Sequence, residues 1–313
     1  MNKEINVLKE YLNRLMYKNF VKEEKPKFLY HYTSINAANS ILSNNQLWVS
    51  DAFKTNDENE IIYIKKVLYE ECFKKENNPL LRDIIEIGFE NIFEMMSKNT
   101  FLLCFSSIKN SRKLWKEYSK DDGVCIRFTP NNSLPIRDCL KDKIIRTFYD
   151  INDKIITVEF PKLLEYSHSV CYNKDIMKEK VLEYFALIEK TINMIHFNFE
   201  DSSDDKTKNN QEVFDFLNEV FTDLFLLSCI CKENFWKEEN EYRYLFILKN
   251  ITHNIIHERV SEIHHKINFL KWDLMNDNIF NIDRIYAKNN DTLRKVKRDL
   301  KRVANNLKFK LLE

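Results

Sequence analysis

Apolar residues recur at three- and four-residue steps in some stretches of the chain and run almost without interruption in shorter ones. The stepped stretches predict amphipathic helices, and the short runs predict buried strands. Long helices are expected at 3–20, 58–76, 79–98, 175–199, 211–230 and about 290–304. Strands are expected at 28–34, 46–50, 101–106, 124–128, 241–248, near 267–272 and at 282–288, with weaker ones within 143–172 and an edge strand at 307–312.

Capping and turn residues mark several ends of these elements. Ser34 or Thr33 can cap a short helix after the first strand, and Ser111 can cap another. Pro79 is placed to start a helix, and Gly123 provides a turn before a strand. The polar run 201–210 has nothing to bury, so we expect it to be a mobile surface loop.

The order of helices and strands is mixed, which favours an α+β fold. We expect a single domain, 1–313, because neither an internal repeat nor a clean linker is evident. Its expected parts are an N-terminal helix at 1–25, the first half of a core at 28–172 with a helical insertion at 58–98, a helical insertion at 175–235, and the second half of the core with a C-terminal helix at 236–313.

Composition excludes several classes of function. Lys and Arg total 49 and Asp and Glu 48, so no global field draws the chain to nucleic acid or membrane. The chain has only two glycines, so it has neither a GxGxxG nor a P-loop. Seven cysteines without CxxC spacing indicate reduced thiols and a cytoplasmic protein. No apolar run reaches the length of about 20 residues that a membrane span needs.

The segment 28–34, FLYHYTS, carries the sharpest candidate residues. His31, Tyr32 and Thr33 place an imidazole, a phenol and a hydroxyl where a buried strand gives way to a helix. Polar side chains there are costly unless they find partners. A structural histidine is one interpretation, and one wall of a ligand site is the other.

A second candidate lies at the start of the strand 241–248. Residues two apart in an extended chain point to the same face, so Glu239, Glu241 and Arg243 are expected to share one side. Neighbouring carboxylates repel, which raises one pKa or requires a cation. An Arg–Glu structural pair and a catalytic carboxylate both remain open.

Other polar and aromatic groups favour structural interpretations. Asn56, Asp57 and Glu60 suit a turn and a helix N-terminus, although they could hold a metal. Trp48, Trp115 and Tyr118 could stack on a planar ring, and Trp115 is expected in the core. A zinc site at His253, His257, His264 and His265 is weighed and not favoured, so no metal site is predicted. The basic set of the last helix is expected to be solvated, with phosphate contact as the minority interpretation: Arg294, Lys295, Lys297, Arg298, Lys301 and Arg302.

Taken in order, these motifs resemble the bacterial domain-of-unknown-function family twenty-nine seventy-one. The pattern LYHYTS, LWxS, FNDPxE, CFS, WxxYxxxxGVCIxF and ExE[WY]R spans about 28–288. A glutamate, Glu58, replaces the proline of FNDP. The matching residues are Leu29 to Ser34; Leu47, Trp48 and Ser50; Asn56, Asp57 and Glu60; Cys104 to Ser106; Trp115, Tyr118, Gly123 to Ile126 and Phe128; and Glu239, Glu241, Tyr242 and Arg243.

That family is in turn distantly similar to the ADP-ribosyltransferase superfamily. This resemblance implies a central antiparallel or mixed split sheet with surrounding and inserted helices, and NAD as the substrate. It implies that Glu241 is the catalytic carboxylate, with Glu239 two residues ahead, and that His31 and Thr33 contact NAD. Ser50 would support the site, and Tyr32, Trp48 and Arg243 are further candidate contacts. The S-T-S motif of the second strand is absent, because Val49 and Asp51 flank Ser50.

The expected function is therefore an NAD-consuming enzyme that transfers ADP-ribose to a protein or nucleic acid, or hydrolyses NAD. A role as a toxin or phage-defence effector, held inactive by a regulatory partner, is implied by the resemblance. One alternative is a catalytically inactive module that binds a nucleotide or another protein. Another is a metal-dependent nuclease that uses Asp57 and Glu60.

Overall fold

The structure is a computed structural model that describes most of the 313 residues. The described residues are 2–21, 26–54, 61–74, 79–119, 123–131, 145–159, 163–198, 205–249, 253–260, 266–277, 279–300 and 308–311.

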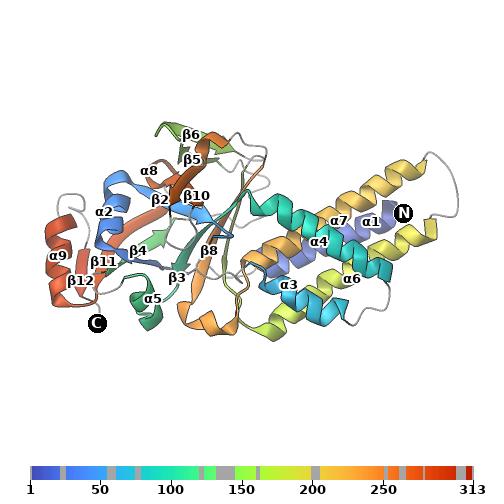
Figure 1. The fold of residues 1–313 in the computed structure, drawn as a ribbon, viewed down its shortest axis with the longest axis horizontal. Helices are drawn as coiled ribbons and strands as arrows, with labels where there is room; N and C mark the ends of the chain where they lie inside the picture. Colours follow the sequence, from blue (N-terminus) through green and yellow to red (C-terminus); the bar gives the residue numbers. More distant parts are fainter. Residues whose placement is uncertain are drawn as a thin grey trace. The chain divides into compact units, whose positions relative to one another are not determined.

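The chain divides into two compact units, each assembled from three separate segments (Figure 1). The helical unit comprises Met1–Lys22, Thr55–Asn99 and Cys171–Asn234. The sheet unit comprises Glu23–Lys54, Thr100–Val170 and Phe235–Glu313. That the chain forms a single domain stays a prediction.

The helical unit is built from amphipathic helices around a core of their own. Buried residues such as Leu12, Ile85, Tyr184 and Phe221 line its interior. Ion pairs tie its outer faces together, among them Lys18 with Glu183 at 2.9 Å. Its elements are α1 (Asn2–Met16), η1 (Tyr17–Val21), α3 (Tyr63–Leu68), η2 (Tyr69–Phe73), α4 (Pro79–Ser97), α6 (Lys174–Asn198) and α7 (Asp205–Cys229).

The helix α7 starts earlier than expected. The loop prediction for 201–210 is wrong from Asp205 onwards, because those residues are helical. A helix that is already nucleated by an apolar segment adds further turns at little cost. Polar residues can therefore extend it. Residues 201–204 lie outside the described residues.

The sheet unit contains twelve strands among the described residues. They are β1 (Leu29–Ser34), β2 (Gln46–Asp51), β3 (Thr100–Ser106), β4 (Gly123–Pro130), β5 (Ile145–Tyr149), β6 (Ile155–Glu159), β7 (Leu163–Ser169), β8 (Glu241–Leu248), β9 (His257–Val260), β10 (Lys266–Asp273), β11 (Phe280–Ala287) and β12 (Lys308–Leu311). Its helices are α2 (Ile35–Asn44), α5 (Arg112–Glu117), η4 (Asn234–Glu239), η5 (His253–Ile255), α8 (Leu274–Asp277) and α9 (Asn290–Leu300).

The sheet divides at strand β3. Strand β8 pairs along the whole of one edge of β3, so β1 and β2 must share the other edge. β1 meets that edge at Ser106, opposite Tyr30, and β2 meets it at Phe101 and Leu102. The pairing is antiparallel throughout, apart from the parallel pair of β11 and β12. The expected α+β class with a large antiparallel sheet is confirmed.

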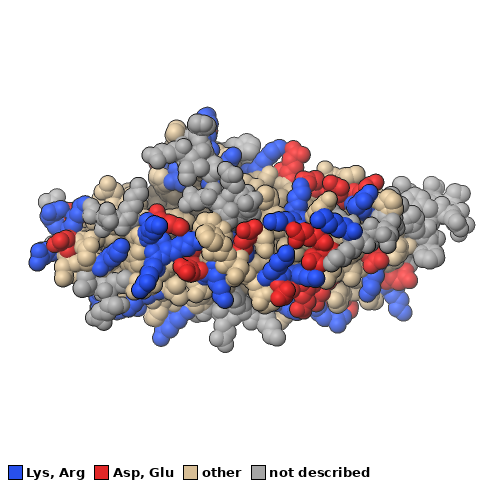
Figure 2. Space-filling view, turned by 60° about the horizontal axis from the view of Figure 1, so that its bottom comes forward, with Lys and Arg blue, Asp and Glu red and all other residues tan. Residues whose placement is uncertain are grey.

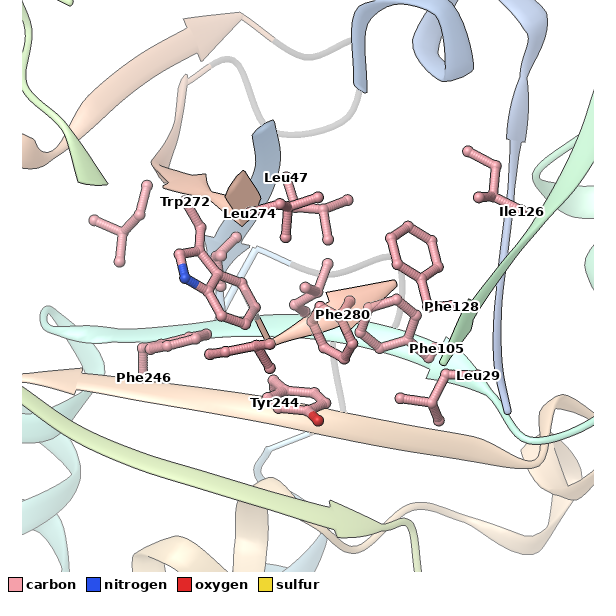
Figure 3. Close-up of a cluster of buried hydrophobic side chains, with 14 of the residues drawn as sticks. Leu29, Leu47, Phe105, Ile126, Phe128, Tyr244, Phe246, Trp272, Leu274 and Phe280 are labelled. Atoms are coloured by element: carbon pink, nitrogen blue, oxygen red, sulfur yellow. The ribbon is translucent and has the colours of Figure 1, made fainter. Parts of the chain in front are cut away.

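One face of this sheet carries the main core. Phe105, Phe128, Tyr244, Trp272 and Phe280 pack edge to face or tilted, with ring centroids 5.1 to 6.0 Å apart (Figure 3). Helix α9 contributes Val296 and Leu300 to the same cluster. We call this side of the sheet the Phe105 face.

The opposite side of β1 and β4 holds a smaller cluster. Tyr30 and Tyr32 pack there with Leu114, Trp115, Cys125 and Tyr286. Trp115 is buried, so the prediction that it belongs to the core is confirmed. Ser111 caps α5 by accepting a hydrogen bond from the amide of Leu114 at 3.2 Å.

Candidate functional site

The acidic pair lies at the junction between η4 and β8. Glu239 is the last residue of the 3-10 helix, and Glu241 is the first residue of the strand. Asn240 lies between them with a φ of 48°, a left-handed conformation that asparagine tolerates better than most residues. The chain therefore turns between the two carboxylates. The expectation that Glu239, Glu241 and Arg243 share one side rests on alternation along an extended chain. That basis is wrong for Glu239, because it belongs to η4 and the turn at Asn240 interrupts the extended segment.

Glu241 and Arg243 form a buried ion pair on one side of β8. The Arg243 Nη2 and Nε atoms donate to Glu241 Oε2 at 2.6 and 3.1 Å. The exposed fraction is 1% for Arg243 and 8% for Glu241, so the pair is shielded from water. Each charge is thereby held by the other in a fixed orientation.

Glu239 is enclosed by a different set of groups. Its side chain is fully buried, and Lys113 Nζ lies 3.9 Å from its Oε1. The hydroxyl of Ser106 donates to the Glu239 carbonyl at 2.7 Å. Lys113 also lies 3.7 Å from the centre of the Trp236 ring, a cation–π contact. This lysine anchors η4 against the start of α5.

His31 lies at the division of the sheet. Its Nδ1 is 3.5 Å from the Cys104 carbonyl, and its ring meets Phe105 and Phe128 edge to face. Burial lowers the pKa of His31 below its ordinary value, and the Cys104 carbonyl partly offsets that effect. The imidazole is therefore held neutral near pH 7.

Strand register decides which candidates can meet. Residues directly opposite each other in paired strands share a face. Glu241 is opposite Ser106, and Ser106 is opposite Tyr30 on its other side. We call this side of the sheet the Glu241 face. Because side chains alternate, His31 and Thr33 project from the Phe105 face instead. The fold brings the two segments within two strands of each other but sends His31 and Glu241 to opposite faces.

Tyr32 shares the Glu241 face and is engaged in local structure. Its hydroxyl donates to the Ile108 carbonyl at 2.9 Å and accepts from the Ser111 amide at 3.0 Å. Its ring packs at 90° on Trp115. These contacts fix the loop before α5, and the predicted NAD contact of Tyr32 stays a prediction.

Trp48 and Ser50 lie on the Glu241 face as well. Ser50 is opposite Leu102 of β3. Leu102 is four residues from Ser106, so these two positions of β3 are about 13 Å apart. Trp48 is 44% exposed and lies against Phe269, with ring centroids 4.5 Å apart. Arg259 Nη2 donates to the Ser50 hydroxyl at 3.4 Å, and the Arg259 guanidinium lies 5.7 Å from the centre of the Trp48 ring.

Two of these residues were missed in the sequence. Arg259 belongs to β9, whose four residues, HERV, contain no apolar run that would mark a strand. Lys113 follows the capping residue Ser111 by two positions, and that spacing carries no sign of its contact with Glu239. Only contacts between segments that are distant in the sequence bring either residue to the site.

Comparison with known protein families finds a match within the chain. A family described as "Protein of unknown function (DUF2971)" matches residues 114–244. The predicted family resemblance is confirmed over this segment. The DUF2971 match contains Glu239, Glu241 and Arg243, and it leaves out the segments with His31 and Ser50. No curated protein matches the chain.

Two solved structures share a weak similarity with the chain. The structure of Thermus sp. 2.9 DarT in complex with NAD+ is 9% identical, with 93% of this chain and 98% of that chain covered and a TM-score of 0.28. The structure of the same protein in complex with ADP-ribosylated ssDNA is 11% identical, with 93% and 96% covered and a TM-score of 0.27. Similarities at these TM-scores carry no argument about this chain.

The other predicted sites fall partly outside the described residues. Asn56, Asp57, Glu60, His264 and His265 are among those not described. Within the described ranges, no group of three His, Cys, Asp or Glu side chains is arranged to hold a metal ion. Among those same residues, no helix combines the length and the apolar character needed to cross a bilayer.

Proposed function

We propose that the protein is an NAD-consuming enzyme of the ADP-ribosyltransferase-like type, with Glu241 as its catalytic carboxylate. The observation that supports this best is the position of Glu241. It is a buried carboxylate at the first residue of a central strand, held by Arg243, with Glu239 two residues ahead. The motif resemblance implies a carboxylate at this place in the fold.

The chemistry of the proposal needs a fixed negative charge. When the bond between ribose C1′ and the nicotinamide nitrogen breaks, the bonding electrons leave with nicotinamide and positive charge develops on the ribose ring. A carboxylate that accepts a hydrogen bond from the 2′-hydroxyl stabilises that charge. An acceptor nucleophile, or water, then attacks C1′, and its proton passes to the solvent. Arg243 would keep Glu241 oriented.

The register supports a revised set of binding residues. Trp48, Ser50 and Arg259 share the Glu241 face, where Arg259 supplies a cation for phosphate and Trp48 an exposed ring for stacking. His31 and Thr33 project from the other face, so we leave them out of the set that acts with Glu241. A split-sheet fold of the ADP-ribosyltransferase-like type is part of the proposal.

The test is release of nicotinamide and transfer of label from NAD labelled in its ADP-ribose part. The Glu241→Gln variant should lose about a hundredfold or more of the rate, because the fixed charge is gone. Glu238→Gln is the matched control, since Glu238 is an exposed carboxylate three residues away in η4. Equal activity of wild type and Glu241→Gln would overturn the assignment.

A nucleotide-binding module without turnover is the second candidate. The observation that favours it is that Glu241 is already engaged by Arg243, and Glu239 lies beside Lys113. This candidate predicts that NAD or its fragments raise the melting temperature while no nicotinamide is released. Binding that survives in Glu241→Gln without any wild-type turnover would favour it over the enzyme.

The remaining expectations stay predictions. A metal-dependent nuclease would depend on Asp57 and Glu60, which lie outside the described residues. Cleavage of nucleic acid that is abolished by EDTA would support it. A toxin or phage-defence role and a regulatory partner are likewise untested.

A further inference from the structure

A row of positive charges crosses three neighbouring strands on the Glu241 face. Arg127 of β4 is opposite Arg284 of β11, and Arg284 is in register with Lys308 of β12. Two residues further along these strands, Lys310 is in register with Tyr286. Neighbouring strands are about 4.8 Å apart, so the row is about 10 Å long. We call Arg127, Arg284, Lys308 and Lys310 the cation row.

Among the described residues, the ion pair of Asp283 with Arg127 compensates part of this charge. Asp283, at the irregularity in β11, accepts from Arg127 Nε at 2.8 Å and also from its Nη2. The Arg127 guanidinium holds the pKa of the Asp283 carboxyl below its ordinary value, so the carboxyl is ionised at neutral pH. Arg284, Lys308 and Lys310 still leave an excess of positive charge. Like charges on facing strands destabilise a sheet, so the row carries a cost in the free protein.

Aromatic rings contact two members of the cation row, Arg127 and Arg284, and the neighbouring Lys109. The Arg127 guanidinium lies 4.1 Å from the centre of the Phe28 ring. Lys109 Nζ and the Arg284 guanidinium lie 5.6 and 6.0 Å from the Tyr286 ring centre. Such contacts fix the positions of charged groups before any ligand arrives.

Arg284 has hydrogen-bonding capacity to spare. Its Nη1 donates to the Tyr286 hydroxyl at 3.4 Å, but its buried Nε has no hydrogen-bond partner among the described residues. A buried donor without a partner costs free energy in the folded protein. Figure 2 shows Lys and Arg side chains gathered in the left half of the view, with few Asp or Glu among them.

We propose that the cation row binds the phosphate backbone of a nucleic-acid strand. The cation row crosses about 10 Å from Arg127 to Lys308, with Lys310 further along β12, which exceeds the size of one phosphate and suits consecutive phosphates of a chain. Most contacts would go to phosphates, so binding would be independent of sequence and sensitive to salt. The net charge of the whole chain is only +1, so this affinity would be local to the row. The site goes beyond the proposed NAD chemistry and does not depend on it.

The test is fluorescence anisotropy with a labelled single-stranded oligonucleotide of mixed sequence, over a series of salt concentrations. The Arg284→Gln, Lys308→Gln double variant should bind about tenfold more weakly. The slope of log affinity against log salt should fall by about 1.4, which is about 0.7 for each phosphate that is no longer neutralised. A Lys308→Glu, Lys310→Glu variant on the exposed strand gives a second route to the same result.

The matched control is the Lys3→Gln, Arg14→Gln double variant. It also removes one lysine and one arginine, but from exposed positions of α1 in the helical unit. It should bind as wild type does. An equal weakening in the control, or oligonucleotide binding that does not change with salt, would overturn the proposal. Binding to vesicles that contain phosphatidylserine, without binding to the oligonucleotide, would also overturn the proposal. Each variant's circular dichroism and melting temperature establish that it is folded.

Discussion

The buried pair of Glu241 and Arg243 is the most consequential contact at the level of single residues. Its groups are almost wholly shielded from water, so removing one partner takes a close counter-charge from the other while it stays buried. A surface pair would contribute far less. The same contact therefore bears on stability and on any chemistry at Glu241.

Replacing Glu241 by alanine should lower the free energy of unfolding by about 3 kcal/mol, because buried Arg243 loses the carboxylate that accepts two of its hydrogen bonds. Glu241→Gln should cost less, since the amide oxygen can still accept from the guanidinium. Unfolding in urea, followed by circular dichroism, measures both. Glu238→Ala should stay within about 0.5 kcal/mol of wild type. A similarly small change for Glu241→Ala would show that the pair contributes little.

His31 predicts a dependence of stability on pH. Its pKa is lowered in the folded protein by burial, so the unfolded chain takes up a proton near the ordinary value of 6.5 while the folded chain does not. The unfolded state is thus favoured as the pH falls through that value. The melting temperature should drop between pH 7.5 and pH 5.5.

Substitution separates this effect from other titrations. His31→Gln should reduce the drop, because the group that takes up the proton is gone. Thr33→Val, on the same strand and face, should leave it unchanged. If the His31→Gln profile matches that of wild type, His31 is not the group responsible.

Among the elements, α5 is tied to η4 by the side chain of Ser111. Ser111 caps this helix, and its hydroxyl also donates to the Glu238 carbonyl of η4 at 3.1 Å. Ser34 caps α2 through the Ala37 amide at 3.2 Å, and it is exposed. The two serines therefore differ in what they hold.

Ser111→Ala should lower the free energy of unfolding by about 2 kcal/mol, and Ser34→Ala by about 1 kcal/mol. The difference reflects the additional hydrogen bond to η4. Thermal and chemical denaturation of the two variants provide the comparison. Equal costs would indicate that the bond to Glu238 contributes nothing to stability.

Local patterns predicted the elements well, and non-local pairing decided the site. Continuous apolar runs placed β3 and β8 within a residue of their observed bounds, and Ser111 was correctly identified as a cap. The faces of His31 and Glu241 depend on Ser106 being opposite both Tyr30 and Glu241. A shift of one residue in either register would reverse a face, and no local signal fixes it. The turn at Asn240 was also not predicted from the sequence.

At the scale of the whole molecule, each unit has its own core. In the helical unit, Gly88 of α4 packs closely against Phe221 of α7. An added Cβ at Gly88 would lie 2.3 Å from Phe221 Cε2. Alanine normally stabilises a helix relative to glycine, but here the crowding outweighs that gain.

Gly88→Ala should therefore destabilise the helical unit by about 1 to 3 kcal/mol. Hydrogen–deuterium exchange should increase in α4 and α7 more than in β3 and β8, if the units open separately. Trp272→Ala, in the core of the sheet unit, should give the reverse pattern. An equal increase everywhere in both variants would show that the units unfold together and would support the expected single domain.

The alternation of segments between the units also sets the order of events on the ribosome. The helical unit is complete in sequence only once residue 234 has been made. β3 has to wait 135 residues, from Ser106 to Glu241, for the strand that covers its long edge. Until then the long edge of β3 exposes unpaired backbone N–H and C=O groups, which can pair with other chains. We therefore expect the nascent chain to need chaperones most between these two points of synthesis.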